Sequence, residues 1–130
     1  MPDSILSIDP TSKLRTNVNN KAFYDTIVDE KKIFPNKYQL YTFAIMAAII
    51  QGVEPDTSVK NLDICLVKNA LNEPENFDVA KGLIVKLCPE IANGNELIKR
   101  MNEYADAGIA ILQSDYNKND GELNLDSFID

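Results

Sequence analysis

The sequence has no histidine, and this absence excludes several kinds of site at once. Without an imidazole the chain cannot build a Ser-His or Cys-His nucleophile pair, a histidine-ligated metal centre or an imidazole pH switch from its own residues. Its five glycines are dispersed, and they form neither a G-x-G-x-x-G nor a G-K-S/T phosphate-binding pattern. We therefore predict a protein that is not an enzyme and that holds no cofactor and no metal.

Arginine is also scarce, because Arg15 and Arg100 are the only two in the chain. The formal net charge is −7, and residues 1–37 carry six basic and five acidic side chains, whereas residues 38–130 carry seven basic and fifteen acidic ones. A protein that binds DNA tightly needs a clustered basic face, because phosphate neutralisation supplies most of the affinity. The composition therefore argues against tight, direct nucleic-acid binding by the isolated chain, although a protein partner could supply the missing positive charge.

Cysteine and targeting signals are sparse as well. Cys65 and Cys88 form no C-x-x-C pair and each lies in an apolar setting, which predicts buried, reduced thiols. The N-terminal sequence MPDSILSIDP has neither the basic region nor the apolar region of a signal peptide. We therefore expect a cytoplasmic protein that does not associate with a membrane.

The most apolar stretch present is NKYQLYTFAIMAAIIQG, residues 36–52. Asn36 is a suitable N-cap with Gln39 three positions later, and Gly52 is a typical helix stop. A helix over residues 36–51 would be about 24 Å long, which is too short to span a bilayer. We predict a central helix at 36–51 that neighbouring elements surround on nearly all sides.

Apolar spacing predicts further helices on both sides of this stretch. A short helix should begin at Asn20, with Phe23 and Ile27 facing inward, and should end before the charged residues 29–32. The segment 61–71 favours a helix, although its β-branched residues leave a strand open over 59–69. Residues 74–87 have clear three- and four-residue apolar spacing and should form an amphipathic helix.

The longest helix is expected at residues 96–113, after a capping turn at Asn93-Gly94-Asn95. Its interior Gly108 costs about 1 kcal/mol relative to alanine, so a close helix crossing is the natural reason for it. We expect Ala105 and Gly108 to face the small residues of the 36–51 helix, which are Ala44, Ala47 and Ala48. A homodimer through Ala105 and Gly108 remains open at this point.

These elements together predict an all-α fold, a compact single-domain bundle of about five helices around the central apolar helix (36–51). The single domain, 1–130, would comprise an irregular N-terminal arm (1–18), a helical core (19–113) and an acidic tail segment (114–130). Between Asp115 and Asp126 the tail resembles the front of an EF-hand loop. Asp120 occupies the position of the required glycine, however, so we predict a solvated turn and no calcium site.

Two stretches, IFPNKYQLYTFAIMAA at 33–48 and NEYADAGIAIL at 102–112, resemble a known family. It is the small accessory protein, often called associated protein 4, encoded beside DNA phosphorothioation (dnd-type) modification and restriction genes. Asp106 and Ala107 depart from the Asn-Gly of its second motif. The resemblance implies a compact helical protein with a binding role, and it suggests packing or partner contacts at Phe43, Ala47, Glu103, Tyr104, Ala105 and Gly108.

The expected function is therefore that of a non-catalytic accessory or adaptor protein of a DNA modification or anti-phage defence system, acting through protein-protein contacts. Candidate contact segments are the near-neutral N-terminal arm and the apolar C-terminal segment. An alternative is an acidic inhibitor of a nuclease or toxin, such as an immunity protein, an antitoxin or a DNA mimic. A third is a helix-turn-helix DNA-binding regulator built from residues 63–71 and 74–87.

Overall fold

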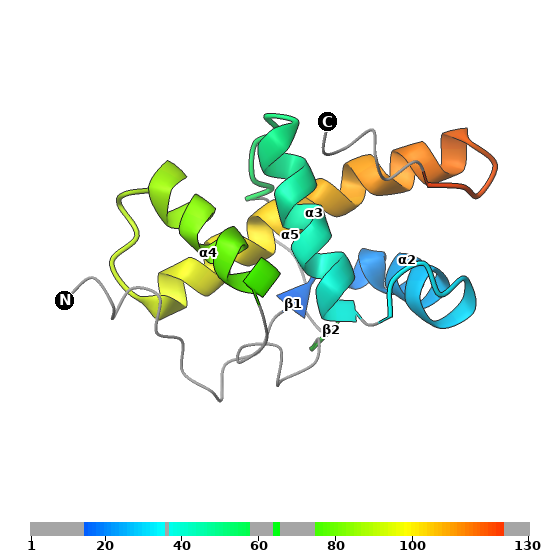
Figure 1. Ribbon diagram of the computed structural model, residues 1–130, viewed down its shortest axis with the longest axis horizontal. Coiled ribbons are helices and arrows are strands. Elements are labelled where there is room, and N and C mark those ends of the chain that lie inside the picture. Colours follow the sequence, from blue (N-terminus) through cyan, green and yellow to red (C-terminus); the bar gives the residue numbers. More distant parts are fainter. Residues whose placement is uncertain (1–14, 36, 58–63, 66–74, 124–130) are drawn as a thin grey trace.

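The computed structural model describes residues 15–35, 37–57, 64–65 and 75–123, and most of these residues are helical (Figure 1). This helical content is compatible with the all-α class that the sequence predicts. No helix in these ranges combines the length and the apolar character that a membrane crossing requires. In chain order the elements are β1 (Arg15–Thr16), the 3-10 turn η1 (Val18–Asn20), α2 (Lys21–Tyr24), the π-helical η2 (Asp25–Glu30), α3 (Lys37–Ile50), β2 (Ile64–Cys65), α4 (Glu75–Leu87) and α5 (Gly94–Lys118).

Helix α3 is the helix expected at residues 36–51, and it stops where the sequence predicts. Gly52 takes a left-handed conformation with φ of 70°. The N–H of Gly52 donates to the Ile49 carbonyl (3.1 Å) and the N–H of Val53 donates to the Ala48 carbonyl (2.8 Å). This pair of bonds is a Schellman motif, which satisfies carbonyl groups that a helix end leaves without partners. The N-cap assigned to Asn36 lies outside the described residues.

Helices α3 and α5 cross at small residues, as predicted (Figure 1). A Cβ added at Gly108 would lie 2.8 Å from the Cα of Ala44 and still closer to the Ala44 carbonyl group. Ala47 and Ala105 are completely buried. Ala105 and Gly108 are both buried within their own chain, which does not favour the alternative of a homodimer through these two residues.

Helix α5 extends further than the sequence predicts at its C-terminal end. It begins at the expected cap, where the Asn93 side chain accepts a hydrogen bond from the Glu96 N–H (3.0 Å). The predicted end at residue 113 is wrong, because the helix continues to Lys118. The Tyr116 ring packs edge-on against Phe23, with 5.7 Å between ring centroids, and gives the last polar turn a tertiary contact. The first residues of the predicted acidic tail segment therefore belong to the helix.

The helix predicted from Asn20 is present as α2 and η2, and Phe23 and Ile27 are buried as expected. Its predicted end before residue 29 is wrong, because η2 includes Asp29 and Glu30. The N–H of Ile33 donates to the carbonyl of Ile27 (2.9 Å) after the turn at Lys32, whose φ is 54°. This hydrogen bond closes the turn that follows η2 and contains the charged residues Lys31 and Lys32.

The helix preferred for residues 61–71 is wrong at Ile64 and Cys65, which form strand β2. Strand β2 pairs antiparallel with β1, with Arg15 opposite Cys65 and Thr16 opposite Ile64. β-Branched residues such as Ile64 and Thr16 suit an extended backbone, and a short apolar run does not distinguish a strand from a helix. Residues 61–63 and 66–71 lie outside the described ranges, as do residues 1–14 of the predicted arm.

The helix predicted for residues 74–87 is present as α4. Cys88 follows it directly and is a buried free thiol, as predicted. The side chain of Cys65 lies outside the description. Among the described residues, the helix count therefore falls short of the expected five-helix bundle because the 61–71 segment contains a strand.

Two glycine-to-alanine substitutions should have opposite effects on stability. Gly108→Ala places a Cβ against the backbone of Ala44, and we expect it to lower the free energy of unfolding by about 1–3 kcal/mol through overpacking. Gly82→Ala, on the exposed face of α4 with nothing within 4 Å of the added Cβ, should raise it by about 0.5–1 kcal/mol. Urea denaturation measures both values. A stabilised Gly108→Ala variant would contradict the close crossing.

Candidate functional site

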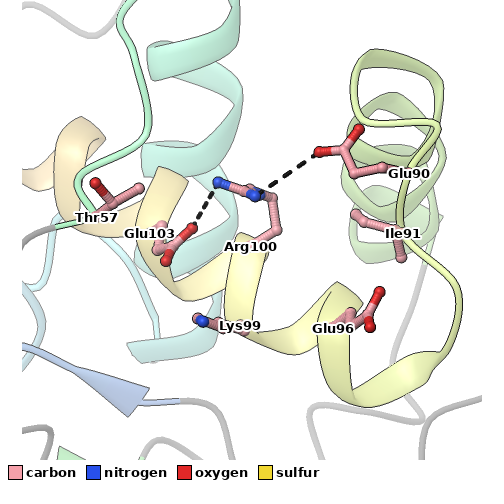
Figure 2. Close-up of a pocket in the computed structure, with 7 residues that line it drawn as sticks. All are labelled: Thr57, Glu90, Ile91, Glu96, Lys99, Arg100 and Glu103. Atoms are coloured by element: carbon pink, nitrogen blue, oxygen red, sulfur yellow. Dashed lines mark hydrogen bonds and ion pairs between the residues drawn. The ribbon is translucent and has the colours of Figure 1, made fainter.

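A cleft of about 400 Å³ lies where the first turns of α5 face the α4–α5 loop and the segment after α3 (Figure 2). Five of its seven lining side chains are charged. The lining residues are Thr57, Glu90, Ile91, Glu96, Lys99, Arg100 and Glu103. Three acidic and two basic groups therefore share one surface depression.

Helix α5 supplies most of the charged side chains that line the cleft. Three of them, Glu96, Arg100 and Glu103, are four and three residues apart, and this spacing places them on one face of the helix. The Glu96 carboxylate accepts a hydrogen bond from the Ala92 N–H (2.8 Å), while its own N–H donates to the Asn93 cap. Glu96 thus fixes the loop that enters α5. This reciprocal arrangement resembles a capping box and orients the wall of the cleft.

Arg100 is held firmly on one side and loosely on the other (Figure 2). Its Nη1 donates to the Glu103 carboxylate at 2.9 Å, and the Glu103 side chain is only 15% exposed. Its Nη2 lies 3.8 Å from the Glu90 carboxylate, which is 65% exposed. An exposed pair at that distance contributes little stability, so Glu90 can exchange partners at small cost.

The segment after α3, which contributes Thr57 to the cleft, is held by a hydrogen bond to the backbone of α5. The Asp56 N–H donates to the carbonyl oxygen of Glu103 (3.0 Å), which keeps the neighbouring Thr57 at the rim. Glu103 therefore fixes two parts of the site, because its carboxylate holds Arg100 and its carbonyl holds the segment after α3. Ligand pockets for small molecules are mostly apolar, whereas this charged lining suits the polar surface of another macromolecule.

A buried polar cluster lies one turn further along α5, around Asp106, which is 6% exposed. Its Oδ1 accepts hydrogen bonds from the Thr16 hydroxyl (2.7 Å), the Asn20 side-chain amide (3.1 Å) and the Asn17 N–H (3.3 Å). Burying a carboxylate is costly unless hydrogen bonds replace its hydration. The N-terminal residues 16–20 therefore supply the polar groups that this carboxylate requires.

Two buried tyrosines adjoin the cluster. The Tyr41 hydroxyl donates to the side-chain carbonyl of Asn102 (2.6 Å), whereas the Tyr24 hydroxyl is buried without a hydrogen bond. Thr16 lies close to Tyr24, but the Thr16 hydroxyl donates to Asp106 instead. Burial raises the pKa of both tyrosines, and the negative charge of Asp106 adds to the effect. Both phenols are therefore neutral at physiological pH.

The six residues suggested by the resemblance divide between the core and the surface. Gly108 packs against Ala44 where α3 and α5 cross, Ala47 and Ala105 are completely buried, and Tyr104 is 8% exposed. Phe43 is half-buried, and its ring lies 5.4 Å from that of Phe34. Glu103 is the member of the set that lines the cleft.

Sequence reasoning missed the other charged residues of the cleft. The three-residue spacing of Arg100 and Glu103 was a usable signal for a helix-surface ion pair. Glu90 was not recognisable, because only the path of the α4–α5 loop brings it to Arg100. Asp115, which suggested an EF-hand, lies within α5, where its carboxylate accepts a hydrogen bond from the Asn119 side chain (3.0 Å). Asp126 lies outside the described residues.

No family model matches this chain, and comparison with curated proteins and with solved structures gave no match either. The described residues contain no group of three or more Cys, Asp or Glu side chains arranged to hold a metal ion.

Removing the two buried hydroxyl groups should have unequal effects. Tyr41→Phe removes the donor to Asn102, which is itself 7% exposed, and we expect a loss of about 1–3 kcal/mol in the free energy of unfolding. Tyr24→Phe removes a hydroxyl that makes no hydrogen bond, so it should be neutral or stabilising. Thermal and urea denaturation of the two variants test this difference. Equal losses would contradict it.

Stability should decrease in alkaline solution. The folded-state pKa of Tyr24 and Tyr41 lies above the value of about 10 for an exposed tyrosine, so the folded state retains protons that the unfolded state releases. The contribution is fully present below pH ~10 and is lost as the pH rises above it. Phenolate absorbance should therefore develop together with loss of the helical circular dichroism signal. Complete tyrosine ionisation with unchanged helix content would contradict this prediction.

Proposed function

We propose that this chain is a non-catalytic accessory or adaptor protein of a cytoplasmic DNA modification or anti-phage defence system. It acts by binding a basic protein that handles DNA. The observation that carries the proposal is the charged cleft on α5. Within the resembling stretch 102–112 there are two charged residues, and while Asp106 is buried, Glu103 lines this cleft. The stretch thus combines a packing face with a charged position at the surface.

The charges of the cleft support a basic partner. Three glutamates face two cations, and the loosely paired Glu90 can accept a lysine or arginine from another protein. Glu54 lies on the same chain segment as Thr57 and is also exposed. Complementary charge of this kind accelerates association and selects among partners.

An acidic inhibitor of a nuclease or toxin is the second candidate. The excess of acidic over basic side chains in residues 38–130 favours it, because a negative surface can occupy a nucleic-acid-binding site. Such an inhibitor would use the same exposed glutamates as the adaptor. The two candidates differ in the partner and in what binding does to the partner's activity.

The helix-turn-helix alternative loses its support. It requires a helix over residues 63–71, and Ile64 and Cys65 form strand β2 in that segment. A recognition helix also needs basic side chains at the DNA phosphates, which the composition does not favour.

A charge reversal in the cleft tests the proposal. We expect Glu90→Lys to weaken binding to the basic partner by about tenfold or more, because it places like charges together at the contact. The matched control is Glu122→Lys, which makes the same change in net charge at an exposed position beyond the end of α5. Calorimetric titration should use the purified products of the neighbouring genes, with the control changing affinity by no more than about twofold.

The outcomes separate the candidates. If the neighbouring genes encode neither sulfur-modification nor other defence proteins, the adaptor proposal fails. Inhibition of a small nuclease by the chain, relieved by Glu90→Lys, would support the second candidate instead. A salt-dependent shift of duplex DNA by the isolated chain would count against both.

A further inference from the structure

Residues 15–20, which we call the N-terminal strap, contact both strand β2 and helix α5. The strap consists of β1 and η1, and its Arg15 and Thr16 pair with β2. On its other side, Thr16, Asn17 and Asn20 donate hydrogen bonds to Asp106 of α5. The strap therefore lies between strand β2 and the longest helix.

Three of the hydrogen bonds that attach the strap to α5 end at the same atom. This atom is Oδ1 of Asp106, which lies about ninety residues away in sequence. The Asn20 side chain also donates to the Thr16 hydroxyl (3.0 Å), so the donors are connected to one another. Hydrogen bonds to a charged acceptor are stronger than neutral ones, and networks of this kind act together. Loss of the acceptor should therefore loosen all of them at once.

The strap and the helical core are held by different interactions. Thr16, Asn17, Asn19 and Asn20 make the strap polar, and Asn17 closes it internally by accepting hydrogen bonds from the N–H groups of Asn19 and Asn20. Helices α3 and α5, by contrast, meet at Ala44 and Gly108 and carry completely buried apolar side chains such as Ile45 and Ile109. Apolar packing of that kind does not require the strap hydrogen bonds.

The hydration of the Asp106 carboxylate lowers the cost of detaching the strap. A carboxylate in the interior gives up its hydration, and the strap replaces that hydration only while it stays docked. When the strap leaves, water regains access to Asp106 and solvates it. Local opening of segments with few apolar contacts generally costs less than global unfolding.

We propose that Asp106 acts as a clasp, meaning the acceptor that holds the N-terminal strap on α5. The strap detaches from α5 as a unit while the helical core stays folded. Detachment uncovers Asp106 and the neighbouring Tyr24 and frees the segment before α2 to reach another molecule. The strap is thus a conformational device built into the fold. It stands independently of the adaptor proposal, because it rests on contacts within this chain.

Amide hydrogen exchange followed by NMR tests the clasp. Asp106→Leu removes the acceptor and Thr16→Val removes the donor at the shortest hydrogen bond. In each variant the exchange of the Asn17 and Asn20 amides should accelerate by about tenfold or more, whereas amides within α3 should change by no more than about twofold. Asp106→Asn keeps an acceptor oxygen and should preserve part of the protection.

Asp115→Leu is the matched control, because it makes the same chemical change on α5 near the contact with Asn119 and away from the strap. It should leave the Asn17 and Asn20 amides unchanged. Equal acceleration of strap and α3 amides in Thr16→Val would show that the strap opens only with the whole fold, and would overturn the proposal. Unchanged strap amides in both Asp106→Leu and Thr16→Val would overturn it as well. If Asp106→Leu fails to fold, Thr16→Val decides the question.

Discussion

The close approach of α3 to α5 at Ala44 and Gly108 is the constraint on which the rest of the described structure depends. Backbones can come this close only where one residue has no Cβ, so the crossing fixes both the position and the rotation of α5. Once that rotation is fixed, the neighbours of the other faces of α5 are fixed as well. Glu103 faces the cleft, Asp106 faces the strap and Tyr116 reaches Phe23.

The sequence predicted the parts of this arrangement that depend on local pattern. Apolar spacing and capping residues located α3, α4 and the start of α5, and the small residues identified the crossing itself. The parts it did not predict depend on contacts distant in sequence. Strand β2 requires β1, the last turn of α5 gains its contact from Phe23, and the Asp106 acceptor has its donors at Thr16 and Asn20. A one-dimensional pattern contains no information about which distant residues will supply such partners.

The candidate site also has a part that local sequence spacing predicts and a part that depends on contacts distant in sequence. The ion pair of Arg100 and Glu103 is readable from helix spacing, whereas the contribution of Glu90 depends on the α4–α5 loop. Four of the six residues that suggested packing or partner contacts, Ala47, Tyr104, Ala105 and Gly108, are buried, so their pattern describes packing more than binding. The cleft combines charged side chains from α5 and from the α4–α5 loop, whereas the strap is attached to α5 by hydrogen bonds to Asp106.

The missing side chain at position 108 also limits how this protein can evolve. Every amino acid other than glycine brings a Cβ, and that atom would meet backbone of Ala44, which no change of rotamer can move aside. Any single substitution at this position therefore destabilises the fold unless α3 moves away from α5. The backbone position of α3 and the glycine of α5 therefore have to be inherited together.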